Sequence, residues 1–202
     1  MRDSIDELAE LFKRFPGIGE RQARRFVYYL IERNEEFRRT LSERITSLSK
    51  QVTQCRECYR FFQTDGNDLC DICASGSRDR SVVMIVEKDA DIIAVEKSGF
   101  QGTYFVLGGL IPIADEKNIR HTRIDKLQTF LLKKRTDLKE LVLGFPMNPS
   151  GDFTDQYVRK VLEAYASENS IRIASLGRGL STGTELEYSD PETIKNALKN
   201  RA

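Results

Sequence analysis

The sequence of 202 residues lacks tryptophan altogether and contains a single histidine, three methionines and five prolines. It also lacks an uninterrupted apolar run of the ~18 residues that a membrane-spanning helix needs. The first ten residues are acidic and amphipathic, unlike the apolar stretch of a signal peptide. We therefore expect a cytoplasmic protein with no part in a membrane.

With one histidine, the chain has a single candidate for an imidazole catalyst or metal ligand. His121 lies in a polar stretch with Arg120 and Arg123, and no serine or cysteine nucleophile is close to it in the sequence. We expect an exposed loop residue and not a catalyst or a metal ligand.

An excess of charge of either sign is also missing. The 32 lysines and arginines almost cancel the 31 aspartates and glutamates, which leaves a formal charge of +1. Any affinity for nucleic acid must therefore come from a local basic patch and not from bulk charge. Hydrophobic residues make up 40% and charged residues 31%, a composition typical of globular proteins that excludes disorder for most of the chain.

The chain has few cysteines, but they form two pairs, Cys55-x2-Cys58 and Cys70-x2-Cys73, separated by eleven residues rich in turn formers. A Cys-x2-Cys pair folds as a knuckle that presents two thiolates to one ion, and two knuckles complete a tetrahedron around Zn²⁺. The alternative is four structural or oxidised cysteines, which the paired spacing in an intracellular chain disfavours. Because thiolates fill all four positions, we expect one structural Zn²⁺ per chain without a catalytic role.

The N-terminal quarter of the chain has helical periodicity. Ser4 and Glu7 have the spacing of a capping box, which places the start of a first helix there. Pro16, Gly17 and Gly19 interrupt the pattern, so we expect two helices joined by a glycine turn, followed by a third helix. The apolar residues that repeat at helical intervals cover residues 5–15, 23–31 and 37–52.

Basic side chains crowd around this glycine turn. Backbone N–H groups at the positive end of a helix dipole form a site for a phosphate oxygen, and glycine lets a DNA strand approach without a Cβ. Such contacts involve phosphates and not bases, so we expect no sequence specificity. A structural turn with solvated arginines explains the same pattern equally well. The candidate DNA-binding residues are Lys13, Gly17, Ile18, Gly19, Arg21, Arg24 and Arg25.

From about residue 81, strand and helix patterns alternate to residue 174. A βαβ series predicts a mainly parallel sheet with helices on both faces and a ligand site beyond the carboxyl ends of the strands. Those ends carry Glu87, the pair Gly108-Gly109 and the loop 147–154. A closing helix is expected from Pro191.

The order of these parts resembles the bacterial RecR family of recombination mediators. The resemblance rests on Pro16-Gly17-Ile18-Gly19, the paired cysteines, Val86-Glu87, Val106-Leu107-Gly108-Gly109 and the tail from Glu185 to Asp190. It implies a helix-hairpin-helix, a Toprim domain and a non-enzymatic, nucleoid-associated clamp that binds DNA as a dimer or a ring-shaped tetramer. It also implies that the clamp works with RecO, and in many bacteria RecF, to load recombinase onto single-stranded DNA. Arg21 and Arg25 fall where members of the family carry basic residues used on DNA.

The acidic residues depart from the family's pattern. Metal-dependent Toprim enzymes need a strand-end glutamate and a cluster of aspartates to hold Mg²⁺. Glu87 and Asp91 are present, but the stretch that typically holds two glutamates retains only Asp152, with Ser150 in the other place. We therefore doubt that Mg²⁺ binds, and Glu87 is equally explained as a solvated or helix-capping carboxylate. The loop 111–121 also differs from the glycine-rich stretch usual in the family, which puts the interaction surface there in doubt.

The sequence thus predicts an α+β protein of several modules. The leading hypothesis is a DNA-binding clamp of recombinational repair that is not an enzyme. The alternatives are a metal-dependent Toprim enzyme of the nuclease or primase type, and a zinc-ribbon adaptor that binds only protein. The expected modules are a helix-hairpin-helix region at 1–53, a four-cysteine zinc finger at 54–77, a Toprim α/β domain with a mainly parallel sheet at 78–176, and a C-terminal assembly tail at 177–202.

Overall fold

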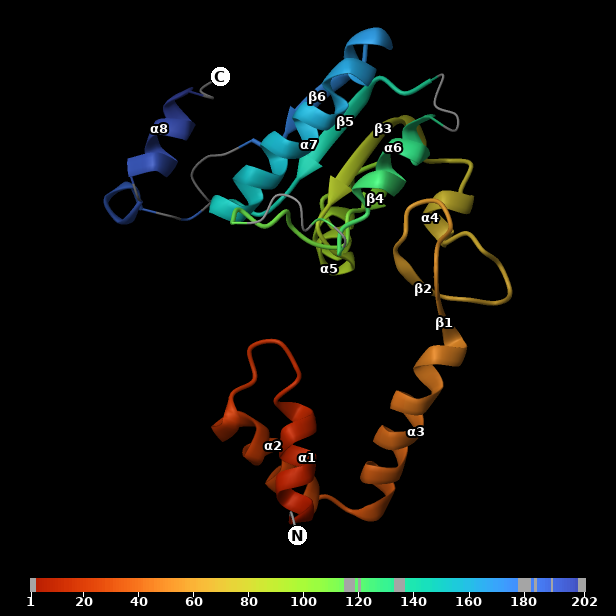
Figure 1. Ribbon diagram of the computed structural model, residues 1–202, viewed down its shortest axis with the longest axis vertical. Coiled ribbons are helices and arrows are strands. Elements are labelled where there is room, and N and C mark those ends of the chain that lie inside the picture. Colours follow the sequence, from red (N-terminus) through yellow and green to blue (C-terminus); the bar gives the residue numbers. More distant parts are fainter. Residues whose placement is uncertain are drawn as a thin grey trace. The chain divides into compact units, whose positions relative to one another are not determined.

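The computed structural model describes residues 3–114, 119, 121–132, 137–177, 183, 185–189 and 191–199 (Figure 1). Contacts between residues divide the chain into two compact units, residues 1–52 and 53–202, which are described separately. None of the described helices is long and apolar enough to cross a membrane.

The first unit contains the three expected helices, α1 (Ser4–Phe12), α2 (Glu20–Ile31) and α3 (Glu35–Gln51). Helices α1 and α2 pack against each other around the buried side chains of Ala9, Ala23 and Val27. These small side chains let the two helix axes approach closely. The expected cap at Ser4 is wrong by one residue, because the carboxylate of Asp3 accepts the hydrogen bond from the Ile5 N–H and Ser4 is already helical.

Helix α3 differs from the other two because none of its residues is buried. Its apolar side chains nevertheless recur at helical spacing, on one side of the helix. They are Phe37, Leu41, Ile45 and Leu48, with exposed fractions from 37% to 60%. We call these four residues the α3 stripe.

After α3 the chain forms a small two-stranded sheet, β1 (Val52–Gln54) and β2 (Phe61–Gln63), followed by the short helix α4 (Asp71–Ala74). The first cysteine pair lies between the two strands, and the second pair lies at and inside α4. We call residues 53–77 the cysteine segment.

A four-stranded sheet forms the centre of the second unit, as the βαβ pattern predicts. Its strands are β3 (Asp79–Val86), β4 (Gly102–Val106), β5 (Glu140–Gly144) and β6 (Arg172–Ser175), in the order β4-β3-β5-β6, and every pair is parallel. The connecting helices are α5 (Asp89–Glu96), α6 (Ile124–Leu132) and α7 (Pro149–Glu168). The short helix η1 (Leu186–Tyr188) and the expected closing helix α8 (Pro191–Lys199) follow.

The two faces of this sheet are covered differently. Val83, Ile85 and Phe105 point to one face and pack with side chains of α6 and α7. Met84 and Tyr104 point to the other face, because side chains alternate along a strand. That second face packs against Ile92 of α5 and against all four cysteines. The cysteine segment therefore completes the second covering layer of the sheet.

Candidate metal centre and nucleic-acid interface

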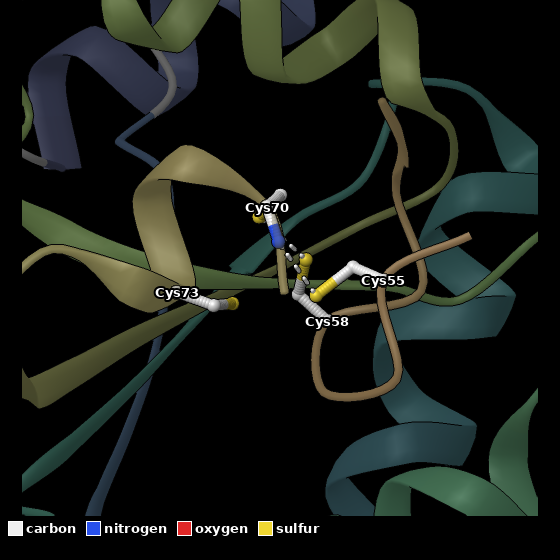
Figure 2. A group of neighbouring side chains, drawn as sticks. All are labelled: Cys55, Cys58, Cys70 and Cys73. Carbon is white, nitrogen blue, oxygen red and sulfur yellow. Dashed lines mark hydrogen bonds between the residues drawn. The ribbon is translucent and has the colours of Figure 1, made fainter. Parts of the chain in front are cut away.

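The four cysteines meet at one point, although two sequence-distant knuckles carry them (Figure 2). Their sulfur atoms all lie within 4.8 Å of one another, and all four residues are buried. The Sγ atoms of Cys58 and Cys70 are 3.6 Å apart. A tetrahedron with Zn–S bonds of about 2.3 Å has sulfur–sulfur edges of about 3.8 Å. The cluster thus has the spacing of a tetrathiolate metal site, and all four cysteines are free thiols rather than disulfides.

The four thiol groups shift one another's pKa in opposite directions, so that the pKa values of Cys55 and Cys70 are lowered and those of Cys58 and Cys73 are raised. The backbone N–H of Cys70 donates to Sγ of Cys55 at 3.5 Å. The hydrogen bond between the Cys55 and Cys58 thiols lowers the pKa of Cys55 and raises the pKa of Cys58. Among the residues that the structure describes, these cysteines are the one group of three or more Cys, His, Asp or Glu side chains positioned to bind a metal ion. Four soft thiolates are the donor set that Zn²⁺ accepts in closed structural sites.

The cysteine segment is joined to the sheet by polar contacts that the sequence pattern did not reveal. The Val106 N–H on edge strand β4 donates to the carbonyl of Cys58 at 2.8 Å. The Phe61 N–H of β2 donates to the carboxylate of Asp89, at the start of α5, at 2.6 Å. The metal site therefore belongs to the same packed unit as the sheet.

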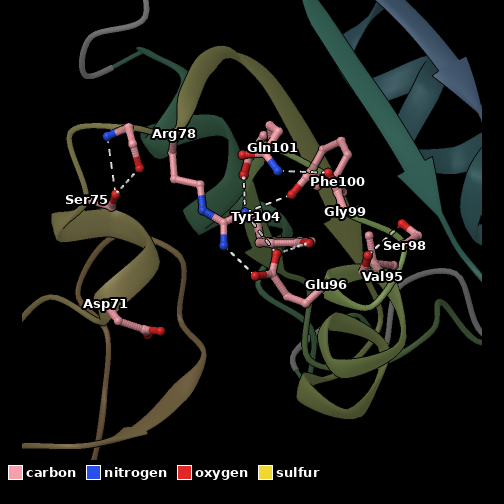
Figure 3. Close-up of polar contacts among 12 residues, drawn as sticks. Asp71, Ser75, Arg78, Val95, Glu96, Ser98, Gly99, Phe100, Gln101 and Tyr104 are labelled. Atoms are coloured by element: carbon pink, nitrogen blue, oxygen red, sulfur yellow. Dashed lines mark hydrogen bonds and ion pairs between the residues drawn. The ribbon is translucent and has the colours of Figure 1, made fainter.

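Further polar contacts are made by Arg78, the residue that directly follows the cysteine segment (Figure 3). The guanidinium of Arg78 donates to the carboxylate of Glu96 at 2.9 Å and to the carbonyl of Phe100 at 2.8 Å. The Tyr104 hydroxyl donates to the same carboxylate at 2.6 Å. The hydrogen bond from Arg78 holds the pKa of Glu96 below its usual value. Burial, together with the hydrogen bond to Glu96, raises the pKa of Tyr104.

The glycine turn between α1 and α2 has the geometry that the sequence indicates. Gly17 has a φ of +75°, a left-handed conformation that favours glycine. Gly19 is the N-cap of α2, and no side chain caps this helix. A Cβ built at either glycine would meet no atom within 4 Å, so the surface around the turn is open. The first N–H groups of α2 therefore remain available to an anion.

The structure divides the candidate basic residues into two groups. Lys13 forms ion pairs with Glu10 at 2.8 Å and Glu20 at 3.1 Å. Arg24 forms ion pairs with Asp6 at 2.8 Å and Glu20 at 3.1 Å. The hydrogen bond with Glu10 raises the pKa of Lys13, and the hydrogen bond from Lys13 lowers the pKa of Glu20. Both cations therefore stabilise the packing of α1 on α2.

Arg21 and Arg25 form the second group. Both are exposed, and neither makes an ion pair with another described residue. They are one helical turn apart on α2, so their guanidinium groups extend from the same side. Ile18, by contrast, is partly buried against the small core of the hairpin.

The acidic candidates Glu87, Asp91 and Asp152 are not brought together as a metal-binding group of three within the described residues. Asp91 accepts a hydrogen bond from the Lys88 N–H at 2.9 Å and thereby caps α5. Glu87 lies at the end of β3, where its carboxylate is 3.9 Å from Nζ of Lys88. Asp152 lies in the first turn of α7.

His121 is exposed, as its polar surroundings predict, and its Nε2 atom lies 2.8 Å from the carbonyl oxygen of Leu110. Much of the divergent loop 111–121, namely residues 115–118 and 120, lies outside the described residues. So do residues 178–182, 184, 190 and 200–202 of the expected assembly tail.

Comparison with known proteins matches three stretches of the chain to family models. These are "RecR, helix-hairpin-helix" at residues 5–48, "Toprim domain" at 81–174 and "RecR, C-terminal" at 179–202. A protein of Lactobacillus acidophilus named "Recombination protein RecR" is 30% identical over 198 residues, which cover 98% of this chain and 96% of the relative. The chain belongs to the RecR family.

Other RecR relatives are similar over the same length. The protein of Roseiflexus castenholzii is 33% identical over 198 residues, which cover 98% of this chain and 92% of its own. That of Parabacteroides distasonis is 31% identical over 202 residues, which cover 100% of this chain and 91% of its own. The expected RecR resemblance and the mixed α+β fold are thereby confirmed.

Proposed function

We propose that this chain is a DNA-binding clamp of recombinational DNA repair that helps to load recombinase onto single-stranded or gapped DNA. The observation that carries the proposal is the pair Arg21 and Arg25, exposed and without ion pairs among the described residues, beside an uncapped helix N-terminus. Its relatives are named for recombination. In this proposal Gly17, Ile18 and Gly19 admit the DNA backbone to the turn, and Lys13 and Arg24 hold the hairpin in shape.

The binding should be independent of base sequence. Backbone N–H groups and arginines at this turn recognise phosphate oxygens, which are the same at every nucleotide. A single chain, whose formal charge is +1, offers little positive charge for binding DNA. We therefore infer that several hairpins act together in a homo-oligomer, either a dimer or a ring-shaped tetramer.

The α3 stripe supports this assembly. It presents four large apolar side chains that the first unit leaves 37% to 60% exposed. A second copy of the same unit would remove this surface from water, which is the dominant driving force for association. RecO, with a RecF-type protein as a further candidate, completes the set of partners in this proposal.

We propose no catalytic residue and no role for Mg²⁺. Asp91 already serves as the cap of α5, and Glu87, Asp91 and Asp152 do not form a metal-binding group of three within the described residues. Incubation of the pure protein with Mg²⁺ and nicked, supercoiled or single-stranded DNA should leave the DNA unchanged. Cleavage, ligation or primer synthesis that disappears in Glu87→Gln would instead support a Toprim enzyme.

Zn²⁺ is the metal that we propose for Cys55, Cys58, Cys70 and Cys73, in a structural role. In this proposal the chain has four modules: the helix-hairpin-helix region at 1–53, the zinc finger at 54–77, the Toprim domain at 78–176 and the assembly tail at 177–202. Within it, the zinc finger is a distinct stretch of sequence that folds against the Toprim domain.

The decisive experiment is the double variant Arg21→Glu with Arg25→Glu, measured by DNA binding at several salt concentrations. Binding should be abolished, with zinc content and oligomer size unchanged. Each single Arg→Ala variant should reduce the slope of log affinity against log salt by about 0.7–0.9, because one phosphate contact is lost.

The control is Arg39→Glu with Lys50→Glu on α3, which changes the net charge by the same amount on exposed residues outside the stripe. This control should bind DNA almost as the wild type does. If the Arg21 and Arg25 variant keeps its affinity and salt slope in intact oligomers, the hairpin is only a structural turn. The zinc-ribbon adaptor would then be the better hypothesis.

A further inference from the structure

The outer face of α2 carries an aromatic side chain in line with the two free arginines. Ala23 and Val27 point inward to the core of the hairpin. Arg21, Arg25 and Tyr28 follow one another at intervals of four and three residues, so they lie on the opposite, solvent side. At 1.5 Å per residue, Tyr28 is about 10 Å along the helix from Arg21.

Tyr28 differs from its neighbour Tyr29 in how its ring is covered. Both tyrosines are half-exposed, at 51% and 50%. The Tyr29 ring lies under the guanidinium of Arg33, 4.3 Å from the ring centroid, and makes an edge contact with Phe37. Tyr28 has no such ring contact among the described residues. One tyrosine is thus already paired, and the other offers an open ring face.

We propose that Tyr28 is a stacking platform for an unpaired base of single-stranded DNA whose phosphates are held by Arg21 and Arg25. The proposal rests on the DNA-binding function proposed above and adds a contact to a base. Bases of single strands can stack on aromatic rings, and any base can do so because every base has a π-face. Within a duplex the base faces are occupied by neighbouring base pairs. The platform therefore favours single strands without reading their sequence.

The charge pattern of α2 supports DNA as the occupant of this face. The acidic residue near the glycine turn, Glu20, is neutralised by Lys13 and Arg24, while Arg21 and Arg25 are left without ion pairs among the described residues. Glu32 follows at the far end, with its carboxylate 4.0 Å from Arg33. Between these ends the face holds two cations and one aromatic ring, the combination that single-strand-binding grooves use.

The test compares Tyr28→Leu with the wild type on an oligo(dT) single strand and on a long blunt-ended duplex. We expect the affinity for the single strand to fall about fivefold or more, with the duplex affinity changed less than about twofold. The salt slope should stay the same, because no phosphate contact is lost. Tyr28→Phe, which keeps the ring, should retain wild-type binding to both.

Tyr29→Leu is the matched control, because it removes an equally exposed tyrosine whose ring is already covered. It should leave the preference for single strands intact. A second readout uses the absence of tryptophan in this chain. The fluorescence of the single tryptophan in Tyr28→Trp should be quenched by oligo(dT) and much less by the duplex.

The outcomes separate the two proposals. If Tyr28→Leu binds single strands as the wild type does, or weakens single strands and duplex equally, the stacking platform is wrong and the phosphate contacts stand. If Arg21→Glu with Arg25→Glu binds DNA normally, the DNA-binding function itself fails. A change in oligomer size for Tyr28→Leu in sedimentation would assign the ring to a contact between chains and would also overturn the platform.

Discussion

Gly151 shows how a single missing side chain shapes this fold. It lies in the first turn of α7 and is buried. A Cβ at this position would lie 1.9 Å from the carbonyl oxygen of Pro146, which is a backbone atom and cannot move aside by a rotamer change. The loop that leads from β5 into α7 can therefore close tightly only if residue 151 is glycine.

Replacing Gly151 by alanine should be strongly destabilising. We expect the free energy of unfolding to fall by about 3 kcal/mol, since the loop or the helix must shift to relieve the overlap. Chemical denaturation followed by circular dichroism measures this change. Gly177→Ala is the control, because a Cβ there would meet no atom within 4 Å. Equal stability of the two variants would show that the loop adjusts freely.

Glu96 makes the stability of the second unit depend on pH. Its pKa is lowered from 4.5 in the folded chain, chiefly by the hydrogen bond from Arg78, so the folded state binds a proton less readily than the unfolded state. The stabilisation from this carboxylate is present above pH 4.5 and is lost as the pH falls below that value. Its size is limited because the side chain is 32% exposed.

The prediction for Glu96 compares Glu96→Gln with the wild type from about pH 7 down to about pH 3. The variant should be less stable at neutral pH, and the difference should shrink as the pH falls through 4.5 and below. Denaturant titrations at each pH measure it. Glu140→Gln provides a control. It removes a carboxylate from the same sheet unit, but one whose ion-pair partner, the Arg172 guanidinium at 3.7 Å, is exposed to solvent. A constant difference across this range would mean that the Glu96 carboxylate does not act through its charge.

The cysteine segment acts as a structural layer of the second unit. Its four thiols share one core with Met84, Val86 and Tyr104 of the large sheet. The carbonyl of Cys58 also accepts a hydrogen bond from edge strand β4. Order in this segment is therefore coupled to order in the sheet, and a segment too short for a core of its own can fold.

We predict one zinc ion per chain by elemental analysis. Cys73→Ala should lose the zinc and lower the free energy of unfolding of residues 53–202 by more than about 3 kcal/mol, because metal binding and folding are coupled. The loss should appear in probes of the sheet as well as in the cysteine segment. Ser77→Ala, an exposed change in the same segment, should alter neither quantity. Zinc-free protein with normal stability would contradict the prediction.

In the proposed DNA clamp, assembly is the property that turns weak single contacts with DNA into strong binding. Every phosphate contact from a near-neutral chain is modest, but several hairpins in one oligomer act at a high effective concentration. The α3 stripe is the apolar surface that we propose for this assembly, since its residues remain exposed within their own unit.

Charges placed in the α3 stripe should therefore break the oligomer. Ile45→Glu with Leu48→Glu is expected to shift the sedimentation coefficient toward that of a smaller species and to weaken DNA binding as severely as the arginine variant does. Arg39→Glu changes the net charge by the same amount on the side of α3 opposite the stripe and should leave both properties unchanged. An unaltered oligomer in the first variant would place the assembly surface elsewhere.

Several features of this protein follow from short stretches of sequence. The Cys-x2-Cys spacing, the glycine turn and the βαβ alternation depend on residues that are neighbours in the chain, and local geometry alone specifies them. For this reason the four-cysteine cluster, the hairpin and the parallel sheet agree with the sequence-based expectations. The cap of α1 differs from its expected position by one residue because Asp3 and Ser4 are both good caps, and only the backbone conformation selects between them.

Other features depend on residues far apart in the sequence. Arg24 and Arg25 are adjacent and identical in type, yet only Arg24 reaches Asp6, because packing of α1 on α2 brings that carboxylate to one side of the helix. Likewise, Arg78 contacts Glu96, and the cysteines share a core with Tyr104, because the folded sheet brings these sequence-distant residues together. Local pattern thus determined which elements form. Tertiary packing decided which of the described arginines on α2 form ion pairs and which do not, since an ion pair depends on distance in space and not on separation along the chain.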